Sequence, residues 1–348
     1  MKILITGGCG FIGSHLIIEL LKNKKHVILN LDKINYASNV YLNRKLLKKK
    51  NYNFKKVDIK NIKKLEKCIL NFKPNYIFHL AAESHVDRSI DGPKPFIESN
   101  IIGTFNLLEI LKKYLSKKQH SKKFKRLHHI STDEVYGDLE KTNDKFTENT
   151  PYNPSSPYSA TKASSDHLVR AWGRTYDIPY IITNCSNNFG SYQFPEKFIP
   201  HIILCLLNNK KIPIYGSGKQ IRDWIFVKDH VDILIKLMKK KVNNDTFNIG
   251  GNNEITNLEI AKKICFILKD SITKNKKINQ LFSYVADRPG HDVKYAVNSK
   301  KVEKILNIKI KNQFKKNLKD TVNWYLNNKE WCDNSMKTKY KLQRLGKI

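Results

Sequence analysis

The 348-residue sequence has no apolar run long enough to cross a membrane. A spanning helix needs about 18 largely apolar residues, whereas the apolar segment at residues 11–21 is interrupted by glycine and polar side chains. The basic, apolar and small-residue regions of a secretory signal do not follow one another either. We therefore expect a soluble protein with no membrane partner.

Cysteine is scarce, and the six cysteines are scattered along the chain. No two of them form a CxxC pair, and no cysteine or histidine spacing is typical of zinc ligands. Scattered thiols in a chain of this length are typical of proteins from reducing compartments. We expect reduced, mostly buried cysteines, no metal site and a cytoplasmic location.

Acidic residues are also few, because 31 Asp and Glu stand against 64 Lys and Arg, for a formal net charge of +33. Such a charge raises the question of a nucleic-acid partner. The excess is nearly all lysine, spread from Lys2 to Lys347 among many Asn and Ile, as an AT-rich genome would encode at tolerant surface positions. No basic motif with interleaved aromatic residues is present. We expect no nucleic-acid partner, although the charge favours an anionic small substrate.

Short β-type segments alternate with longer segments of helical period through the first half of the chain. The β-type segments are KILIT, HVILNL, YNFKKVDI, NYIFHLA, KRLHHIS and PYIITNC, and helices are expected at residues 11–21, 62–71, 95–115 and 159–176. This alternation predicts an α/β fold with a doubly wound parallel (Rossmann) sheet. After Asn188 the alternation weakens, and Pro and Gly punctuate shorter elements, which predicts a smaller mixed α/β lobe.

A glycine motif, GxxGxxG, begins at Gly7 directly after the first strand and opens the first helix. Such glycines permit a tight turn, let the backbone approach a pyrophosphate and let helix and strand pack closely. Asp32 ends the second strand, about 20 residues further on, where a carboxylate can bond an adenosine ribose. The acid favours NAD over NADP despite the adjacent Lys33, and Asp58 can bond the adenine. The alternative is a glycine turn that only packs a helix on a sheet.

These patterns divide the chain into two domains and a tail. We expect residues 1–186 to form the NAD-binding Rossmann domain, with return segments at about 224–262. Residues 187–223 and 263–331 would form the substrate-binding lobe. Residues 332–348, rich in lysine and poor in apolar side chains, would form a basic tail that frays after Trp331.

Tyr158 and Lys162 in YSATK lie four residues apart, on one face of the expected helix at 159–176. A lysine ammonium beside a phenol stabilises the phenolate and lowers the tyrosine pKa toward neutrality. Tyr158 can then take a proton from a hydroxyl group as a hydride leaves the same carbon, and Lys162 can bond the nicotinamide ribose. A chance YxxxK on a helix surface is the alternative.

Thr132, Asp133 and Glu134 follow the fifth strand in HISTDEVYG, at the carboxyl edge of the sheet where open α/β folds bind their ligands. A turn directly after the strand can direct both carboxyl groups into one pocket. Two carboxyls in different environments can divide the work, one protonated as an acid and the other ionised as a base. A solvated acidic turn or a helix cap explains the pattern equally well.

Taken in order, eight segments resemble the dTDP-glucose 4,6-dehydratases, which are extended short-chain dehydrogenase/reductases. They are GGCGFIGS, LDKINYASN, HLAAESHVDRSI, ISTDEVYGD, YSATKASSDHLVRAW, NCSNNFGSYQFPEKFIP, IRDWIFVKDH and RPGHD. The resemblance extends from Met1 to about Trp331. It implies a lyase of nucleotide-sugar metabolism and deoxysugar biosynthesis that reduces and reoxidises NAD within one turnover.

The resemblance also implies a role for each catalytic residue. Tyr158, assisted by Thr132 and Lys162, deprotonates the glucose C4 hydroxyl as the C4 hydride passes to NAD. Glu134 then removes the C5 proton while Asp133 protonates the departing C6 hydroxyl. Hydride then returns to C6 and a proton to C5, and the product is dTDP-4-keto-6-deoxyglucose.

Contact residues follow from the same resemblance. The implied cofactor-binding residues are Gly7, Gly10, Phe11, Ile12, Gly13, Asp32, Lys33, Ile34, Asn35, Asp58, Ile59, Leu80, Ala81, Ala82, Glu83, Ser84, Ser99, Tyr158, Lys162 and Asn188. The implied substrate-binding residues are Ser84, Thr132, Asn187, Lys197, Phe198, Pro213, Ile214, Tyr215, Arg222, Asn257, Asp287, Arg288, Pro289, Gly290 and His291. The basic members suit a nucleotide diphosphate, because arginine can bond phosphate oxygens bidentately. A local ion pair or a solvated lysine is the ordinary alternative for each.

Three other functions stay open. A nucleotide-sugar 4-epimerase shares the fold, NAD, Tyr158 and Lys162, but it needs no acid and base at C5 and C6, so Asp133 and Glu134 argue against it. A 4,6-dehydratase acting on a CDP- or UDP-linked sugar would differ only in its base pocket. An NAD-binding module with a basic polyanion-binding surface would lack turnover. The resemblance further implies a homodimer, whose four-helix interface would use residues 95–115 and 159–176.

Overall fold

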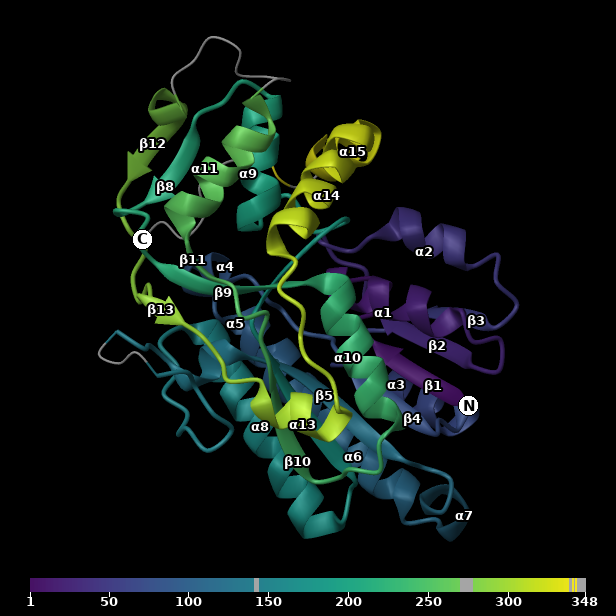
Figure 1. Ribbon diagram of the computed structural model, residues 1–348. Helices are drawn as coiled ribbons and strands as arrows, with labels where there is room; N and C mark the ends of the chain where they lie inside the picture. The colour runs from purple at the N-terminus through teal and green to yellow at the C-terminus, as the bar shows by residue number, and fades with distance from the viewer. Residues whose placement is uncertain (141–143, 270–277, 338–339, 341, 343–348) are drawn as a thin grey trace.

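The computed structural model describes residues 1–140, 144–269, 278–337, 340 and 342. Its main sheet has seven parallel strands in the order β10-β6-β5-β4-β1-β2-β3 (Figure 1). The strands are β1 (Lys2–Thr6), β2 (Val27–Asp32), β3 (Tyr52–Lys56), β4 (Tyr76–His79), β5 (Arg126–Thr132), β6 (Tyr180–Cys185) and β10 (Asp245–Ile249). The chain order reverses between β1 and β4, and ligands of open α/β sheets bind at the carboxyl ends of the strands beside such a point.

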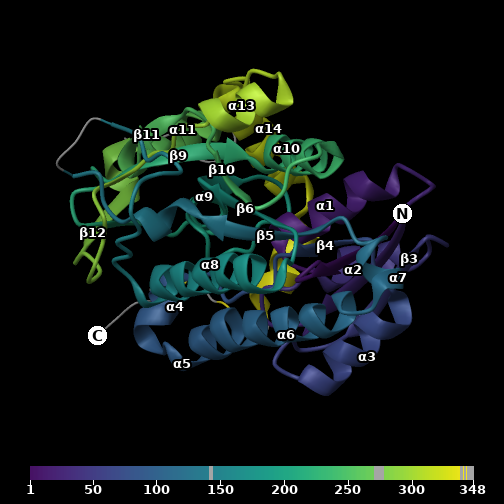
Figure 2. The same cartoon turned by 90° about the horizontal axis from the view of Figure 1, so that it is seen from below.

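Helices cover both faces of the sheet, as Figure 2 shows. One face carries α1 (Phe11–Leu21), α2 (Val40–Leu46), α10 (Val227–Lys239) and α13 (Lys300–Leu306); the other carries α3 (Ile62–Phe72), α6 (Gly103–Leu115) and α8 (Pro157–Tyr176). Because both faces are covered, β1 is an apolar run whose Ile3, Leu4 and Ile5 are fully buried. The predicted doubly wound fold is confirmed.

Short elements connect these layers near the carboxyl edge of the sheet. They are α4 (Val86–Asp91), α5 (Lys94–Phe96), the π-helix η1 (Ile97–Ile102), α7 (Lys118–Ser121) and the 3-10 turn η2 (Asp133–Tyr136). The expected helix at 95–115 is thus three consecutive segments, because η1 interrupts the α-helical hydrogen bonds. π-Bulges of this kind are frequent at functional sites.

A smaller lobe with its own apolar core lies above the sheet in Figure 1. Its strand β9 (Ile221–Phe226) pairs in parallel with β7 (Asn187–Phe189) and β13 (Lys294–Tyr295) and antiparallel with β11 (Glu254–Thr256), while β8 (Ile212–Tyr215) pairs with β12 (Phe282–Val285). Its helical elements are α9 (Phe198–Leu207), α11 (Asn257–Ile267), η3 (Ile278–Leu281), α14 (Phe314–Asn327) and α15 (Lys329–Lys337). The mixed α/β character of this lobe agrees with the predicted fold class.

The tail differs from the expected frayed segment. Helix α15 continues to Lys337, because Trp331 packs against Trp324 and Tyr192, with ring centroids 5.2 and 5.7 Å apart. Tyr340 is buried and hydrogen-bonds His201 Nδ1 at 2.9 Å. Fraying directly after Trp331 was therefore a wrong expectation for α15, because aromatic contacts outweigh the lysine-rich composition. Residues 343–348 lie outside the described part.

No helix among the described residues has both the length and the apolar character that a membrane crossing requires. All six cysteines are free and buried.

Candidate active site

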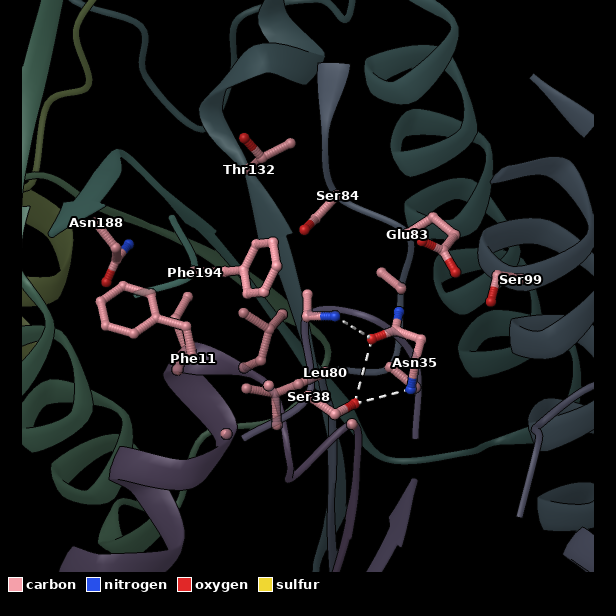
Figure 3. A pocket seen from close by; sticks show the side chains of 18 of the residues that line it. Phe11, Asn35, Ser38, Leu80, Glu83, Ser84, Ser99, Thr132, Asn188 and Phe194 are labelled. Carbon is pink, nitrogen blue, oxygen red and sulfur yellow. Dashed lines mark hydrogen bonds between the residues drawn. The ribbon is translucent and has the colours of Figure 1, made fainter. Parts of the chain in front are cut away.

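A cavity of about 300 Å³ opens at the carboxyl ends of the central strands, beside the reversal between β1 and β4. Figure 3 shows side chains from several elements around it, among them Phe11, Asn35, Glu83, Ser99 and Thr132. The structure brings together most of the residues predicted from sequence here: Gly7, Gly10, Phe11, Ile12, Gly13, Asp32, Lys33, Asn35, Asp58, Ile59, Leu80, Ala81, Ala82, Glu83, Ser84, Ser99, Thr132, Asp133, Glu134, Tyr158, Lys162, Asn187, Asn188 and Lys197 line this one cavity.

The glycine turn leaves no room for side chains at two positions. Gly7 has φ +72°, and a Cβ there would stand 2.6 Å from the Ala81 nitrogen. A Cβ on Gly13 would stand 2.4 Å from the Gly7 carbonyl oxygen. Within the described chain, no side chain caps α1 and its first turn has no acidic residue, so its free N–H groups suit an anion. These features fit a dinucleotide pyrophosphate.

Asp32 is held by two backbone donors at the end of β2. Its carboxylate accepts hydrogen bonds from the Cys9 nitrogen at 2.9 Å and the Ile34 nitrogen at 2.8 Å. Burial raises the Asp32 pKa, and these hydrogen bonds oppose the rise. Among the described residues, Ile34 does not belong to the cavity lining; with φ 56°, its backbone instead orients the acid.

The loop after β2 is closed by short polar contacts. The Asn35 nitrogen donates to Ser38 Oγ at 3.0 Å, and Ser38 Oγ lies 3.2 Å from Asn35 Oδ1 (Figure 3). Lys33 Nζ forms an ion pair with Glu83 Oε1 at 2.5 Å. Lys33 is therefore engaged by a carboxylate, which reduces its availability to a 2′-phosphate.

The turn η2 directs two neighbouring carboxyl groups into the cavity, as the sequence predicted. Thr132 caps it, because its hydroxyl accepts from the Glu134 nitrogen at 3.3 Å. Burial, the Glu134 charge and the Asp223 charge hold the Asp133 pKa well above its usual range. Burial raises the Glu134 pKa as well, but Arg288, Arg222 and Lys197 oppose the rise. The two carboxyls thus have unlike environments.

Helix α8 places Tyr158 and Lys162 in the same cavity. The helix begins at Pro157 with a capping box formed by Ser156 and Ser159, which sets Tyr158 in the first turn. Lys162 Nζ donates to the Ile130 carbonyl at 2.8 Å. Burial, then the charges of Glu134 and Cys185, hold the Tyr158 pKa well above its usual range, while a Thr132 hydrogen bond lowers it. The sequence predicted that Lys162 lowers the Tyr158 pKa; in the structure burial raises this pKa instead, and the Lys162 ammonium bonds the Ile130 carbonyl.

The predicted substrate residues divide into two groups. Ser84, Thr132, Asn187 and Lys197 line the cavity, and Lys197 Nζ donates to the Ser84 carbonyl at 2.7 Å. Among the described residues the remaining members are not part of its lining: Phe198, Pro213, Ile214, Tyr215, Arg222, Asn257, Asp287, Arg288, Pro289, Gly290 and His291.

Two arginines of the second group bond to protein partners. Arg222 Nη2 donates to the Asp292 carbonyl at 2.8 Å, and its guanidinium lies 4.3 Å from the Tyr295 ring centroid. Arg288 forms a 2.6 Å ion pair with Asp87 of α4. Both charges still act on the Glu134 carboxyl, so they lie near the reaction centre.

A family profile described as GDP-mannose 4,6 dehydratase matches residues 4–321. A dTDP-glucose 4,6-dehydratase from Neisseria meningitidis is 48% identical over 352 residues, which cover 99% of both chains. One from Escherichia coli is 48% identical over the full length of both. The chain belongs to the dTDP-glucose 4,6-dehydratase family. The resemblance read from the sequence is thereby confirmed.

Solved structures of the dehydratase family share the fold. The enzyme from Bacillus anthracis in complex with NAD is 39% identical, with a TM-score of 0.85 over 96% of this chain and 99% of that one. The enzyme from Streptomyces venezuelae, with NAD bound, is 35% identical, with a TM-score of 0.88 over 96% and 100%. A UDP-glucose 4-epimerase from Thermotoga maritima has a TM-score of 0.82 at 28% identity, over 94% of this chain and 99% of that one. The fold alone therefore does not separate dehydratases from epimerases.

Several lining residues of this dehydratase-family cavity had no predicted role. Tyr36 donates to Glu196 Oε1 at 2.8 Å, and Arg88 Nε, outside the lining, bonds Glu196 Oε2 at 2.8 Å. Tyr36 and Glu196 lie within the quoted LDKINYASN and FPEKFIP, but a contact across 160 residues left no signal in the sequence. The other lining residues without a predicted role are Leu31, Ala37, Ser38, Val57, Ile130, Ser131, Cys185, Ser186, Gln193 and Phe194.

Proposed function

We propose that this chain is a hydro-lyase that catalyses NAD-dependent dehydration of dTDP-glucose to dTDP-4-keto-6-deoxyglucose. Full-length relatives named dTDP-glucose 4,6-dehydratase support this function. The observation that carries it is the pair Asp133 and Glu134, which face one cavity in different electrostatic environments. Such a pair suits the elimination of water across C5 and C6.

Asp133 is the acid of this pair and Glu134 the base. Burial and the neighbouring carboxylates raise the Asp133 pKa well above its usual range, which favours the protonated form that can donate a proton to the C6 hydroxyl. Burial also raises the Glu134 pKa, but the charges of Arg288, Arg222 and Lys197 oppose the rise and favour its ionised form. It therefore takes the C5 proton.

Tyr158 removes the C4 hydroxyl proton, with Thr132 as its hydrogen-bond partner. NAD, when bound, supplies the hydride acceptor for C4 and the hydride donor for C6. The positive charge of the oxidised nicotinamide would favour the phenolate form of Tyr158 and so offset the effect of burial. Lys162 donates a hydrogen bond to the Ile130 carbonyl near the carboxyl end of β5, and its ammonium supplies a positive charge at the cavity wall.

The cofactor residues lie where this chemistry needs them. The backbone around Gly7 and the start of α1 would hold the pyrophosphate, and Asp32 the adenosine ribose. Other predicted cofactor residues of the lining, including Asp58, Glu83 and Ser99, would surround the adenine and both riboses. Ile34 would contribute through its backbone.

The substrate diphosphate would lie against Lys197, Arg222 and Arg288. Lys197 already lines the cavity, whereas Arg288 pairs with Asp87 at 2.6 Å. Bidentate bonding to phosphate would let Arg288 exchange this partner for the substrate. The other predicted substrate residues, in β8, α11 and the 287–291 loop, would contact the substrate once Arg288 has exchanged its partner.

The chain would act as a cytoplasmic homodimer. Ile97, Ile102, Phe105 and Tyr176 are large apolar side chains that stay exposed on η1, α6 and α8, and Figure 2 shows α6 and α8 side by side on one face. Such a face suits a second copy. Six free thiols suit a reducing compartment. The division into a Rossmann domain, a substrate lobe and a tail belongs to the same proposal.

One experiment separates the dehydratase from its alternatives. Purified protein is incubated with NAD and dTDP-, UDP- or CDP-glucose, and the nucleotide sugars are weighed by mass spectrometry. Loss of one water from dTDP-glucose, without accumulation of NADH, is the expected result. An epimerised sugar of unchanged mass would indicate a 4-epimerase. Loss of water from UDP- or CDP-glucose alone would show that the substrate carries another nucleotide. Absence of turnover, together with salt-sensitive retention of the protein on a DNA column, would favour the binding module.

A further inference from the structure

A second group of buried charges lies behind Lys162. Asp166, one helical turn further along α8, is fully buried. His129 of β5 is also buried, and its Nε2 lies 3.1 Å from Asp166 Oδ1 and 3.5 Å from Lys162 Nζ. One ring nitrogen thus contacts both charged groups, and Asp166 has no part in the mechanism above.

The Asp166 carboxylate connects the end of β5 to α8. Its Oδ2 accepts hydrogen bonds from Ser131 Oγ at 2.8 Å and from the Tyr152 hydroxyl at 2.9 Å. Asn184 Nδ2 donates to the Tyr152 hydroxyl and to the Thr132 carbonyl, both at 3.2 Å. The carboxylate therefore belongs to a network that reaches both Lys162 and the strand end that carries Thr132.

Lys162 and Asp166 each favour the charged form of the other. Lys162 is only 4% exposed; burial lowers its pKa, and Asp166 is the strongest influence that opposes the lowering. Burial acts to raise the Asp166 pKa, but His129, Lys162 and Ser131 outweigh it, so that this pKa is lowered. A buried ammonium without a counter-charge tends to lose its proton.

We propose that Asp166 is a positioning residue that acts through Lys162: its buried carboxylate, linked to Lys162 through His129 Nε2, keeps the Lys162 ammonium charged and in place. The kinetic consequence rests on the proposed function, whereas the electrostatic coupling of Asp166 to Lys162 does not. The titratable groups that act on Lys162, Asp166 or Tyr158 are Arg170, on α8 itself, and, on the elements packed against it, His79, His129, Asp133, Glu134, Tyr136, Tyr152 and Cys185.

The kinetic test isolates oxidation at C4. A dTDP-pentose has no C6 hydroxyl, so its chemistry stops at the 4-keto sugar and reduced nicotinamide accumulates, which absorbance follows. In Asp166→Asn the alkaline limb of this rate, where Lys162 loses its proton, should move to lower pH by about one unit or more. Tyr152→Phe removes one hydrogen bond to the same carboxylate but keeps its charge, and it should leave the limb in place. An unmoved limb in Asp166→Asn, or an equal shift in Tyr152→Phe, would overturn the proposal.

A double-mutant cycle of melting temperatures tests the coupling of Lys162 to Asp166 without any turnover. Lys162→Met leaves the Asp166 charge buried without its ammonium and should lower the melting temperature. Adding Asp166→Asn should restore part of the loss, because the unpaired charge is gone; no restoration would contradict the coupling. The cycle stays decisive if Asp166→Asn alone does not fold, since the double variant then carries the result. A wild type that binds NAD but leaves dTDP-glucose unchanged would defeat the proposed function, while a restored melting temperature would still support the coupling.

Discussion

The cofactor side and the substrate side of the cavity are built in different ways. On the cofactor side, almost every predicted residue lines the cavity, and most of them lie at or just after the carboxyl ends of β1, β2, β3 and β4. On the substrate side, predicted residues of β9 and the 287–291 loop bond to protein partners, as Arg288 does with Asp87. The cofactor side is therefore preformed by local backbone geometry, whereas the substrate side depends on long-range pairs that a ligand would exchange.

The largest effect is expected where the two sides meet, at Glu134. Glu134→Gln removes the base that we propose takes the C5 proton, so kcat should fall about 10²- to 10⁴-fold, with NAD affinity unchanged. Product formation and NAD titration measure both quantities. Glu66→Gln, on an exposed pair with Lys113, is the control and should leave kcat unchanged. A Glu134→Gln enzyme with nearly full kcat would remove Glu134 from the reaction.

The next effect should be confined to the cofactor side. In Gly13→Ala the new Cβ would stand 2.4 Å from the Gly7 carbonyl oxygen, so the free energy of unfolding should fall by about 1–3 kcal/mol and NAD binding should weaken. Gly92→Ala is the matched control, because nothing lies within 4 Å of its Cβ position. Denaturation and calorimetric NAD titration give the readout. Equal effects of both variants would mean that the turn is not tightly built.

On the substrate side, Asp87→Asn removes the partner of a largely buried Arg288. The freed guanidinium should bind dTDP about tenfold more tightly, or about 1.4 kcal/mol, while stability falls because a buried charge loses its counter-ion. Calorimetry with dTDP measures the affinity, and Arg288→Lys should show the opposite change. Weaker dTDP binding by Asp87→Asn would show that Asp87 positions Arg288 rather than competing for it.

The smallest effect concerns the choice between NAD and NADP. Glu83→Gln releases Lys33 from a partly exposed ion pair, and such pairs contribute about 0–1 kcal/mol. NADP binding should therefore improve only a few-fold, with NAD binding nearly unchanged, in competition titrations. Lys33→Gln is the complementary variant and should abolish that gain in the double mutant. If NADP affinity did not increase, Asp32 alone would account for the preference for NAD over NADP.

Much of the fold could be predicted from the sequence, because its signals are local. Strand β1 is a mainly apolar run, and α1 begins and ends at the predicted residues. The glycine motif, Asp32, the η2 carboxyls and the Tyr158–Lys162 pair each depend on spacing within one segment. Residues that depend on one strand–turn–helix unit therefore came together as predicted.

What could not be predicted depends on contacts between distant segments. Nothing local shows that Tyr36 bonds Glu196, or that Arg288 bonds Asp87 instead of facing the cavity. The spacing predicts a lowered Tyr158 pKa, but burial raises this pKa, and the spacing of residues does not reveal burial. The aromatic contacts that extend α15 past Trp331 likewise join separate elements.

In the proposed reaction, the hydride that leaves C4 returns to C6 of the same sugar. The most direct test uses dTDP-glucose with deuterium at C4 and determines the position of the label in the product by NMR and mass spectrometry. The account predicts loss of one water and deuterium at C6. Deuterium retained at C4 of a sugar of unchanged mass would contradict it and indicate epimerisation instead.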